Sequence, residues 1–126
     1  MPVKRKKHIL VIDDEPAWRK ITSHILRNHG YDVLTAGSGA EALKALTTFK
    51  PDLILSDVRM PDMNGFDLVD SLKSNPATSS TPVIFFSAID DYDARKMART
   101  LGAVDYLIKP FNEEEVSSVL SKHLPV

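Results

Sequence analysis

Short apolar runs alternate with longer amphipathic segments along the chain. The apolar runs are rich in β-branched and aromatic residues and poor in charge, which is typical of strands that a parallel sheet buries on both faces. They cover residues 8–12, 31–36, 53–56, 82–87 and 104–108. Each run is followed by apolar residues at helical spacing. The pattern predicts five strand-helix units, a (βα)5 doubly wound α/β domain with helices on both faces of a parallel sheet.

The segments between the strands carry helix start and stop residues. The first begins at Pro16, a favourable first-turn residue, and ends near Gly30. Its apolar stripe is predicted to contain Trp18, Ile21 and Ile25. Before the last helix, Asn112 precedes Glu115 by three residues, an arrangement that favours an N-cap with a reaching acid.

Length and composition indicate one ordinary globular domain. The chain has 126 residues, of which 43% are hydrophobic and 26% charged, and this balance argues against disorder. No apolar run approaches the length of a membrane span and no signal peptide is visible, so we expect a soluble, cytoplasmic protein. The absence of cysteine excludes disulfides and thiolate chemistry.

The charge is unevenly distributed. The formal net charge is −1, with 16 basic and 17 acidic residues, and four of the basic residues lie at positions 4 to 7. We interpret residues 1–7 as a solvated basic leader and residues 8–124 as the domain. A basic run can also contact nucleic acid or a membrane surface, but we expect neither contact here.

Polar side chains suited to chemistry follow four of the predicted strands. Asp13 and Asp14 come after the first, Asp57 after the third, Ser87 ends the fourth and Lys109 follows the fifth. Because the carboxyl ends of parallel strands meet at one edge, these side chains are expected to share a cleft. Simpler interpretations also exist. An acid suits a helix N-terminus, a lysine suits the surface, and serines commonly end strands.

A cluster of three carboxylates implies a compensating cation. Hard oxygen ligands without a nearby histidine or cysteine favour Mg2+ over zinc. A carboxylate, a divalent metal, a hydroxyl and a lysine together make a site for phosphoryl transfer. The carboxylate nucleophile would need no general base, because aspartate is ionised at neutral pH.

The ordered set of site residues resembles the receiver domain of two-component response regulators. The set comprises Asp13-Asp14, Asp57, Met60-Pro61, Gly65, Ser87-Ala88 and Lys109-Pro110-Phe111, within a likeness that runs over residues 8–124. The resemblance is to the single-domain chemotaxis type. It implies a flavodoxin-like fold with strand order 2-1-3-4-5.

The resemblance also implies the metal site and the acceptor. Asp57 would accept a phosphoryl group from a histidine kinase or phosphotransfer protein. Asp14 and Asp57 would bind Mg2+ directly, together with the backbone carbonyl of Arg59, and Asp13 would act mainly through bound water. A receiver catalyses only its own phosphorylation and slow dephosphorylation, so no separate enzyme activity is expected.

A conformational switch follows from the same resemblance. Ser87 and Lys109 would contact the phosphoryl oxygens, and Tyr106 would be the aromatic residue whose ring turns inward on phosphorylation. The surface formed by the fourth helix, the fifth strand and the fifth helix would then change its affinity for a downstream protein or output domain, or for a second copy of the chain. A half-buried tyrosine with its hydroxyl in water is the simpler alternative for Tyr106.

Two details concern the outer part of the cleft. Arg59 and Ile89 each stand two residues beyond a site residue, and the resemblance implies that residues at these positions influence the lifetime of the phosphoryl group. Asp91 is among the residues expected on the partner surface.

Other functions remain open from the sequence. A phosphatase with an aspartate nucleophile would also place an acid after the first strand, and a binding module could use the same fold without phosphorylation. The kinase, the downstream target, the oligomeric state and the extent of the complete protein are not encoded in any motif.

Overall fold

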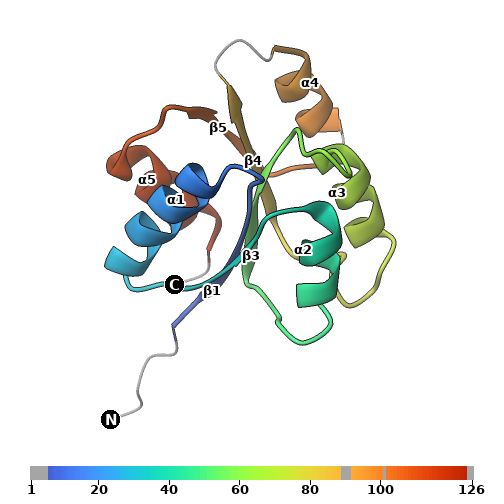
Figure 1. The fold of residues 1–126 in the computed structure, drawn as a ribbon, viewed down its shortest axis with the longest axis horizontal. Coiled ribbons are helices and arrows are strands. Elements are labelled where there is room, and N and C mark those ends of the chain that lie inside the picture. Colours follow the sequence, from blue (N-terminus) through green and yellow to red (C-terminus); the bar gives the residue numbers. More distant parts are fainter. Residues whose placement is uncertain (1–5, 89–91, 101, 125–126) are drawn as a thin grey trace.

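A single parallel sheet lies between two groups of helices (Figure 1). The computed structural model describes residues 6–88, 92–100 and 102–124. The strands within these ranges are β1 (His8–Ile12), β2 (Asp32–Ala36), β3 (Leu53–Asp57), β4 (Val83–Ala88) and β5 (Asp105–Lys109). Their order is β2-β1-β3-β4-β5, and each neighbouring pair is parallel. The predicted fold class and strand order are confirmed.

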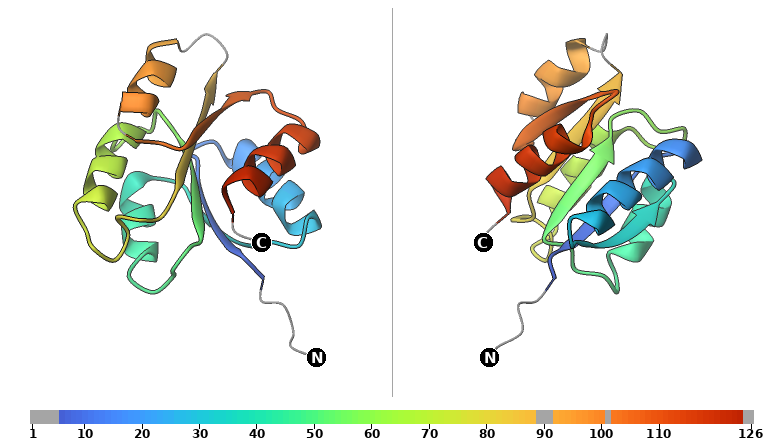
Figure 2. Two further views of the ribbon diagram at one scale, coloured as in Figure 1. Left: turned by 180° about the vertical axis from the view of Figure 1, so that it is seen from behind. Right: turned by 90° about the vertical axis from the view of Figure 1, so that its left-hand side faces the viewer.

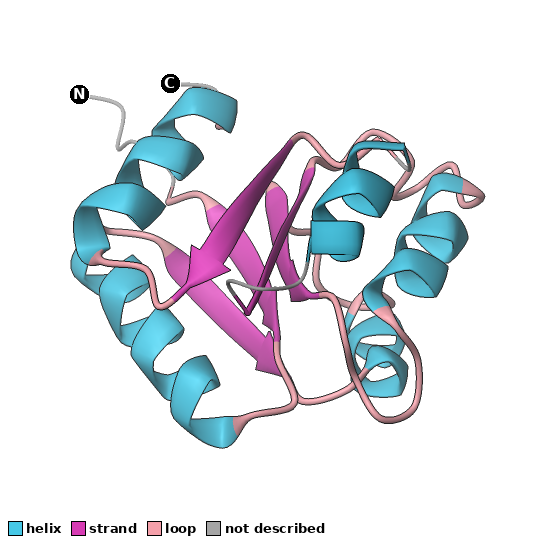
Figure 3. Cartoon of the chain, turned by 90° about the horizontal axis from the view of Figure 1, so that it is seen from above, coloured by secondary structure: helices cyan, strands magenta, loops and turns pink. Residues whose placement is uncertain are grey.

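A helix follows each strand. The helices of the described ranges are α1 (Pro16–Asn28), α2 (Gly39–Ala45), α3 (Gly65–Lys73), α4 (Tyr92–Thr100) and α5 (Glu113–His123). Seen from above, α1 and α5 cover one face of the sheet and α2, α3 and α4 cover the other (Figure 3). The views from behind and from the side show the same two helical layers (Figure 2). In these parts of the chain, no helix has both the length and the apolar character needed to cross a bilayer.

The alternation of side chains along each strand builds two hydrophobic cores. In β1, Leu10 and Ile12 point to the side of α2, α3 and α4, whereas Ile9 and Val11 point to the side of α1 and α5. The same alternation separates Phe85 from Phe86 in β4. Because both faces are buried, the central strands carry continuous apolar runs, as the sequence predicted.

The predicted boundaries shift where local hydrogen bonds compete with the sheet. Residue 31 was expected in a strand, but the Tyr31 N–H donates to Leu26 at the end of α1 and β2 begins one residue later. The same turn contains Gly30, whose φ of +87° favours glycine. At the other edge, Val104 precedes β5 and is 42% exposed.

Two apolar residues predicted to be buried are exposed. Ile21 is 47% exposed, because α1 buries Thr22, Ser23 and Leu26 in its place. Leu34 is 38% exposed, because β2 is the edge strand. The prediction that every strand is buried on both faces is therefore wrong for β2.

The predicted cap of the last helix is present in full. The Asn112 side chain accepts the N–H of Glu115, and the Glu115 carboxylate accepts the N–H of Asn112. This capping box fixes the direction in which α5 leaves the end of β5.

Candidate functional site

Asp57 is the last residue of β3, the central strand. It pairs with Phe86 of β4 and is only 6% exposed. Its Oδ2 lies 3.3 Å from Nζ of Lys109, and its Oδ1 accepts the N–H of Arg59 at 3.4 Å. β3 thus places a carboxylate at the carboxyl ends of the strands, beside the ammonium group of Lys109.

Gly65 allows α3 to begin against the backbone at the end of β3. Its N–H donates to the carbonyl of Val58 at 2.6 Å. A Cβ at this position would lie 2.6 Å from the backbone oxygen of Asp57 and 2.6 Å from the ring of Phe85. Glycine is therefore required here by close approach of the backbone, and any side chain would displace the end of β3.

Asp13 and Asp14 directly follow the neighbouring strand β1. Asp13 is fully buried, and its N–H donates to Ala36 of β2. Its Oδ1 accepts the N–H of Glu15 at 2.9 Å and its Oδ2 accepts Nζ of Lys109 at 2.9 Å. One carboxylate oxygen from each of Asp13, Asp14 and Asp57 lies within 4.8 Å of the others. The three acids can therefore hold a metal ion.

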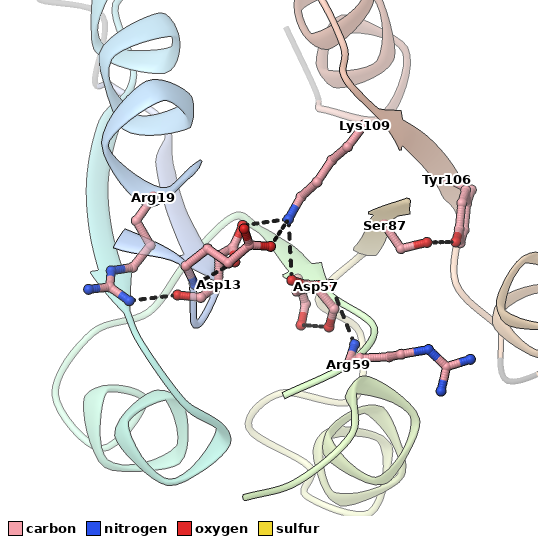
Figure 4. Close-up of polar contacts among 9 residues, drawn as sticks. Asp13, Arg19, Asp57, Arg59, Ser87, Tyr106 and Lys109 are labelled. Carbon is pink, nitrogen blue, oxygen red and sulfur yellow. Dashed lines mark hydrogen bonds and ion pairs between the residues drawn. The ribbon is translucent and has the colours of Figure 1, made fainter. Parts of the chain in front are cut away.

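Lys109 reaches the acids from the end of β5 (Figure 4). It is 9% exposed and contacts the two buried acids, Asp13 and Asp57. Its Nζ also lies 3.5 Å from the more exposed carboxylate of Glu15. The peptide bond between Lys109 and Pro110 is cis. One ammonium group is thus shared among several carboxylates.

Burial and charge set the protonation of the cluster. Burial raises the pKa of Asp57 to about 6; Lys109 opposes this rise, and the charge of Asp13 adds to it. Burial alone would lower the pKa of Lys109, but its hydrogen bond to Asp13 and the two negative charges raise it above the usual value. The lysine consequently remains an ammonium group, while the pKa of Asp57 lies well above the usual value for an aspartate.

Ser87 and Tyr106 meet at the next strand pair. Ser87 stands one residue beyond the β4 partner of Asp57, and its hydroxyl is hydrogen-bonded to the hydroxyl of Tyr106 on β5 (Figure 4). The guanidinium of Arg95 on α4 lies 5.6 Å from the centre of the Tyr106 ring. The contact joins the two residues that were predicted to act together, and the switching role of Tyr106 stays a prediction.

The outer residues are only partly described. Arg59 is exposed, and its guanidinium extends away from the acids (Figure 4). Ile89 and Asp91, which were assigned to phosphoryl lifetime and to partner contact, lie outside the described residues. Of the basic leader, the structure describes Lys6 and Lys7.

Sequence reasoning missed the residues that surround Lys109. Glu15 was not among the predicted site residues, and Trp18 was predicted to lie on the apolar stripe of the first helix. In the structure, Nζ of Lys109 lies 5.2 Å from the Trp18 ring centre and 4.9 Å from that of Phe86. The position of Trp18 one turn after the acids was the available signal, but it did not specify which side chain the ring would meet.

Comparison with known proteins agrees with this geometry. Residues 9–121 match the response regulator receiver domain family. The probable transcriptional regulatory protein TcrX of Mycobacterium tuberculosis is 40% identical over 109 residues, which make up 86% of this chain and 45% of TcrX. The chain thus spans less than half the length of that relative.

Two solved structures extend the likeness to three dimensions. The chemotaxis response regulator CheY4 of Vibrio cholerae is similar with a TM-score of 0.88 and 32% identity, over 95% of this chain and 100% of CheY4. The receiver domain of the sensor histidine kinase PA1611 of Pseudomonas aeruginosa has a TM-score of 0.86 and 26% identity, over 94% of this chain and 98% of that one. That receiver holds a magnesium ion in its active site cleft. The chain belongs to the receiver domain family of two-component response regulators.

Proposed function

We propose that Asp57 accepts a phosphoryl group from a histidine kinase or phosphotransfer protein. The observation that carries the proposal is the position of its carboxylate, at the end of the central strand beside two other acids and Lys109. With a pKa of about 6, Asp57 is largely ionised at neutral pH and needs no general base. In the transfer, a carboxylate oxygen bonds to phosphorus while the bond from phosphorus to the donor atom breaks, and the donor keeps that electron pair.

The acid cluster is assigned to Mg2+. Asp14 and Asp57, with the backbone carbonyl of Arg59, are the proposed direct ligands. Both oxygens of Asp13 already accept hydrogen bonds, which supports its proposed role through water. The donor set is all oxygen, which suits Mg2+, and the related PA1611 receiver holds this ion. When bound, the metal neutralises negative charge on the phosphoryl oxygens.

Lys109 and Ser87 are proposed to receive the phosphoryl oxygens. Lys109 places a retained positive charge beside the acceptor. Ser87 supplies a hydroxyl at the end of the adjoining strand. A charged group positioned in a nearly dry site stabilises developing charge without having to reorganise.

The proposed output is a change of partner affinity at the surface formed by α4, β5 and α5. Two hollows flank Tyr106 on this surface, one of about 290 Å³ towards α4 and one of about 460 Å³ towards α5. When Ser87 binds the phosphoryl group, its bond to Tyr106 must change, and the wall shared by both hollows changes with it. The partner is a downstream protein, an output domain or a second copy of the chain; a coupling of about 1–3 kcal/mol suffices for such a signal.

Labelling with acetyl phosphate and Mg2+ tests the proposal. We expect one phosphoryl group per chain, stable to acid and labile to base, in the wild type. Asp57→Asn should remove the label. Asp52→Asn is the matched control, because Asp52 stands just before the opposite end of the same strand, and it should leave labelling unchanged.

The other outcomes identify the competing functions. Continuous release of inorganic phosphate at many turnovers per chain would indicate a phosphatase. Absence of label from a folded wild-type protein would indicate a binding module that uses the receiver fold without phosphorylation. Either result would overturn the assignment of Asp57 as a signalling acceptor.

A further inference from the structure

The ammonium group of Lys109 lies over two aromatic rings. Its Nζ is 4.9 Å from the ring centre of Phe86 and 5.2 Å from that of Trp18. Both distances fall within the range of attractive cation–π contacts, which strengthen as water is removed. Because Lys109 is 9% exposed, little water competes with the rings for its ammonium group.

The Trp18 ring is fixed by a second set of contacts. It packs against Phe111 at 5.2 Å between ring centres, and Phe111 meets Phe86 edge to face at 5.9 Å. Phe111 follows Lys109 by two residues. The same segment therefore supplies both the ammonium group and the ring against which Trp18 packs. Trp18, Phe111 and Phe86 thus form one continuous aromatic cluster, and the first and last of these rings contact Lys109.

The two rings that contact Lys109 differ in their place in the fold. Phe86 is a fully buried core residue of β4, so its substitution would disturb the sheet. Trp18 is on the first turn of α1, is only partly buried, and packs at the margin of the same core. Its contact with Lys109 can therefore be altered while the centre of the core is kept.

We propose that Trp18 is a positioning residue for Lys109. Its indole ring lies within cation–π distance of the ammonium group, as does the ring of Phe86, and keeps that group beside Asp13 and Asp57. There the ammonium group meets an incoming phosphoryl group without first having to be ordered. The inference rests on the proposed function, since the lysine is positioned for a phosphoryl group on Asp57. It assigns a role to a helix residue that is neither an acid nor a phosphoryl contact.

The rate of labelling by acetyl phosphate tests this role. Trp18→Leu keeps apolar bulk but removes the aromatic face, and should slow labelling about fivefold. Trp18→Phe restores an aromatic face and should recover most of the rate. Ile25→Ala is the control, because Ile25 packs on the same core from the same helix; it should lower stability and keep the rate.

A double-mutant comparison separates positioning from packing. In a Lys109→Met background, Trp18→Leu should change the remaining rate less than about twofold, because no ammonium group is left to hold. Equal rates for wild type and Trp18→Leu would overturn the proposal. So would an equal loss with and without Lys109, or a failure of Trp18→Phe to restore the rate.

Fluorescence provides a readout that does not depend on phosphorylation. Trp18 is the only tryptophan of the chain, so its emission reports on this site alone. Lys109→Met should change the emission of the folded protein, and unchanged emission would contradict the contact. If the wild type takes up no label, the proposed function fails, and the emission comparison then decides whether Trp18 holds Lys109.

Discussion

Acidic residues lie at both ends of the strands, but those at the amino ends and those at the carboxyl ends differ in their exposure to water and in their partners. Near the amino end, Asp52 accepts the backbone N–H of His8 at 2.7 Å. Asp32 lies 3.0 Å from Nδ1 of the same histidine, a close polar contact without hydrogen-bond geometry. At the carboxyl end, three acids lie within reach of one metal ion, and Lys109 bonds to two of them.

The difference shows that burial determines how strongly the charge of an acid interacts with its neighbours. The Asp32 side chain is 57% exposed, so water screens its charge. Asp13 and Asp57 are 0% and 6% exposed, and their charges interact strongly across a region with little water. The same residue type is a surface charge at one end and a candidate metal ligand and nucleophile at the other.

Removal of Lys109 should give the largest effect. Lys109→Met leaves the acids without their buried cation, and we expect labelling by acetyl phosphate to slow about 100-fold, as for the loss of a preorganised charge-stabilising group. Lys50→Met changes an exposed lysine near the amino end and should keep the wild-type rate. Similar losses in both variants would mean that overall charge, rather than position, controls labelling.

Magnesium should stabilise the fold through the carboxyl end only. At a concentration of 100 Kd, Mg2+ should add about 2.7 kcal/mol to the free energy of unfolding, measured by denaturation with and without the metal. Asp14→Asn should remove most of this gain, whereas Asp32→Asn should retain it. Retention of the full gain in Asp14→Asn would exclude Asp14 as a ligand.

Asp57 should destabilise the metal-free protein at neutral pH. Its folded pKa of about 6 exceeds the reference value of 3.8, so its stabilising contribution is complete below pH 3.8 and is lost as the pH rises through 6. Without Mg2+ at pH 7.5, Asp57→Asn should therefore raise the free energy of unfolding by about 1–2 kcal/mol. The gain should shrink towards pH 4. A variant that is less stable than wild type at pH 7.5 would contradict the pKa of Asp57 that burial raises.

The contact between His8 and Asp32 should matter least. It is partly exposed, and such pairs contribute about 0–1 kcal/mol. Asp32→Asn should therefore shift the free energy of unfolding by less than about 1 kcal/mol, and it should leave the labelling rate unchanged. A loss of labelling would show that the two ends of the sheet are coupled.

The fold could be predicted from the sequence because the alternation of apolar runs and amphipathic segments matches the order of strands and helices along the chain. The apolar runs are short, and recognisable residues mark the two ends of α1 (Pro16 and Gly30) and the start of α5 (Asn112). Boundaries were less predictable, because a single hydrogen bond, such as that from Tyr31 to Leu26, moves a strand start. Ile21 was predicted to be buried but is exposed, because an apolar stripe on a helix does not specify which of its residues the neighbouring elements cover.

The acids of the site were predictable for a related reason. Parallel strands bring their carboxyl ends together, so Asp13, Asp14 and Asp57 could be placed in one cleft from their positions after apolar runs. The aromatic surroundings of Lys109 could not, because the contact of Trp18 with this lysine depends on the packing of α1 against the end of β5. Sequence spacing contains no information about that distance.

Mapping of the phosphoryl group tests the central claim most directly. Protein treated with acetyl phosphate and Mg2+ would be digested at acidic pH and sequenced by tandem mass spectrometry. We predict that the added phosphoryl mass lies on Asp57 and on no other residue. A phosphoryl group on Asp52, Asp62 or any other side chain, with Asp57 unmodified, would contradict the account.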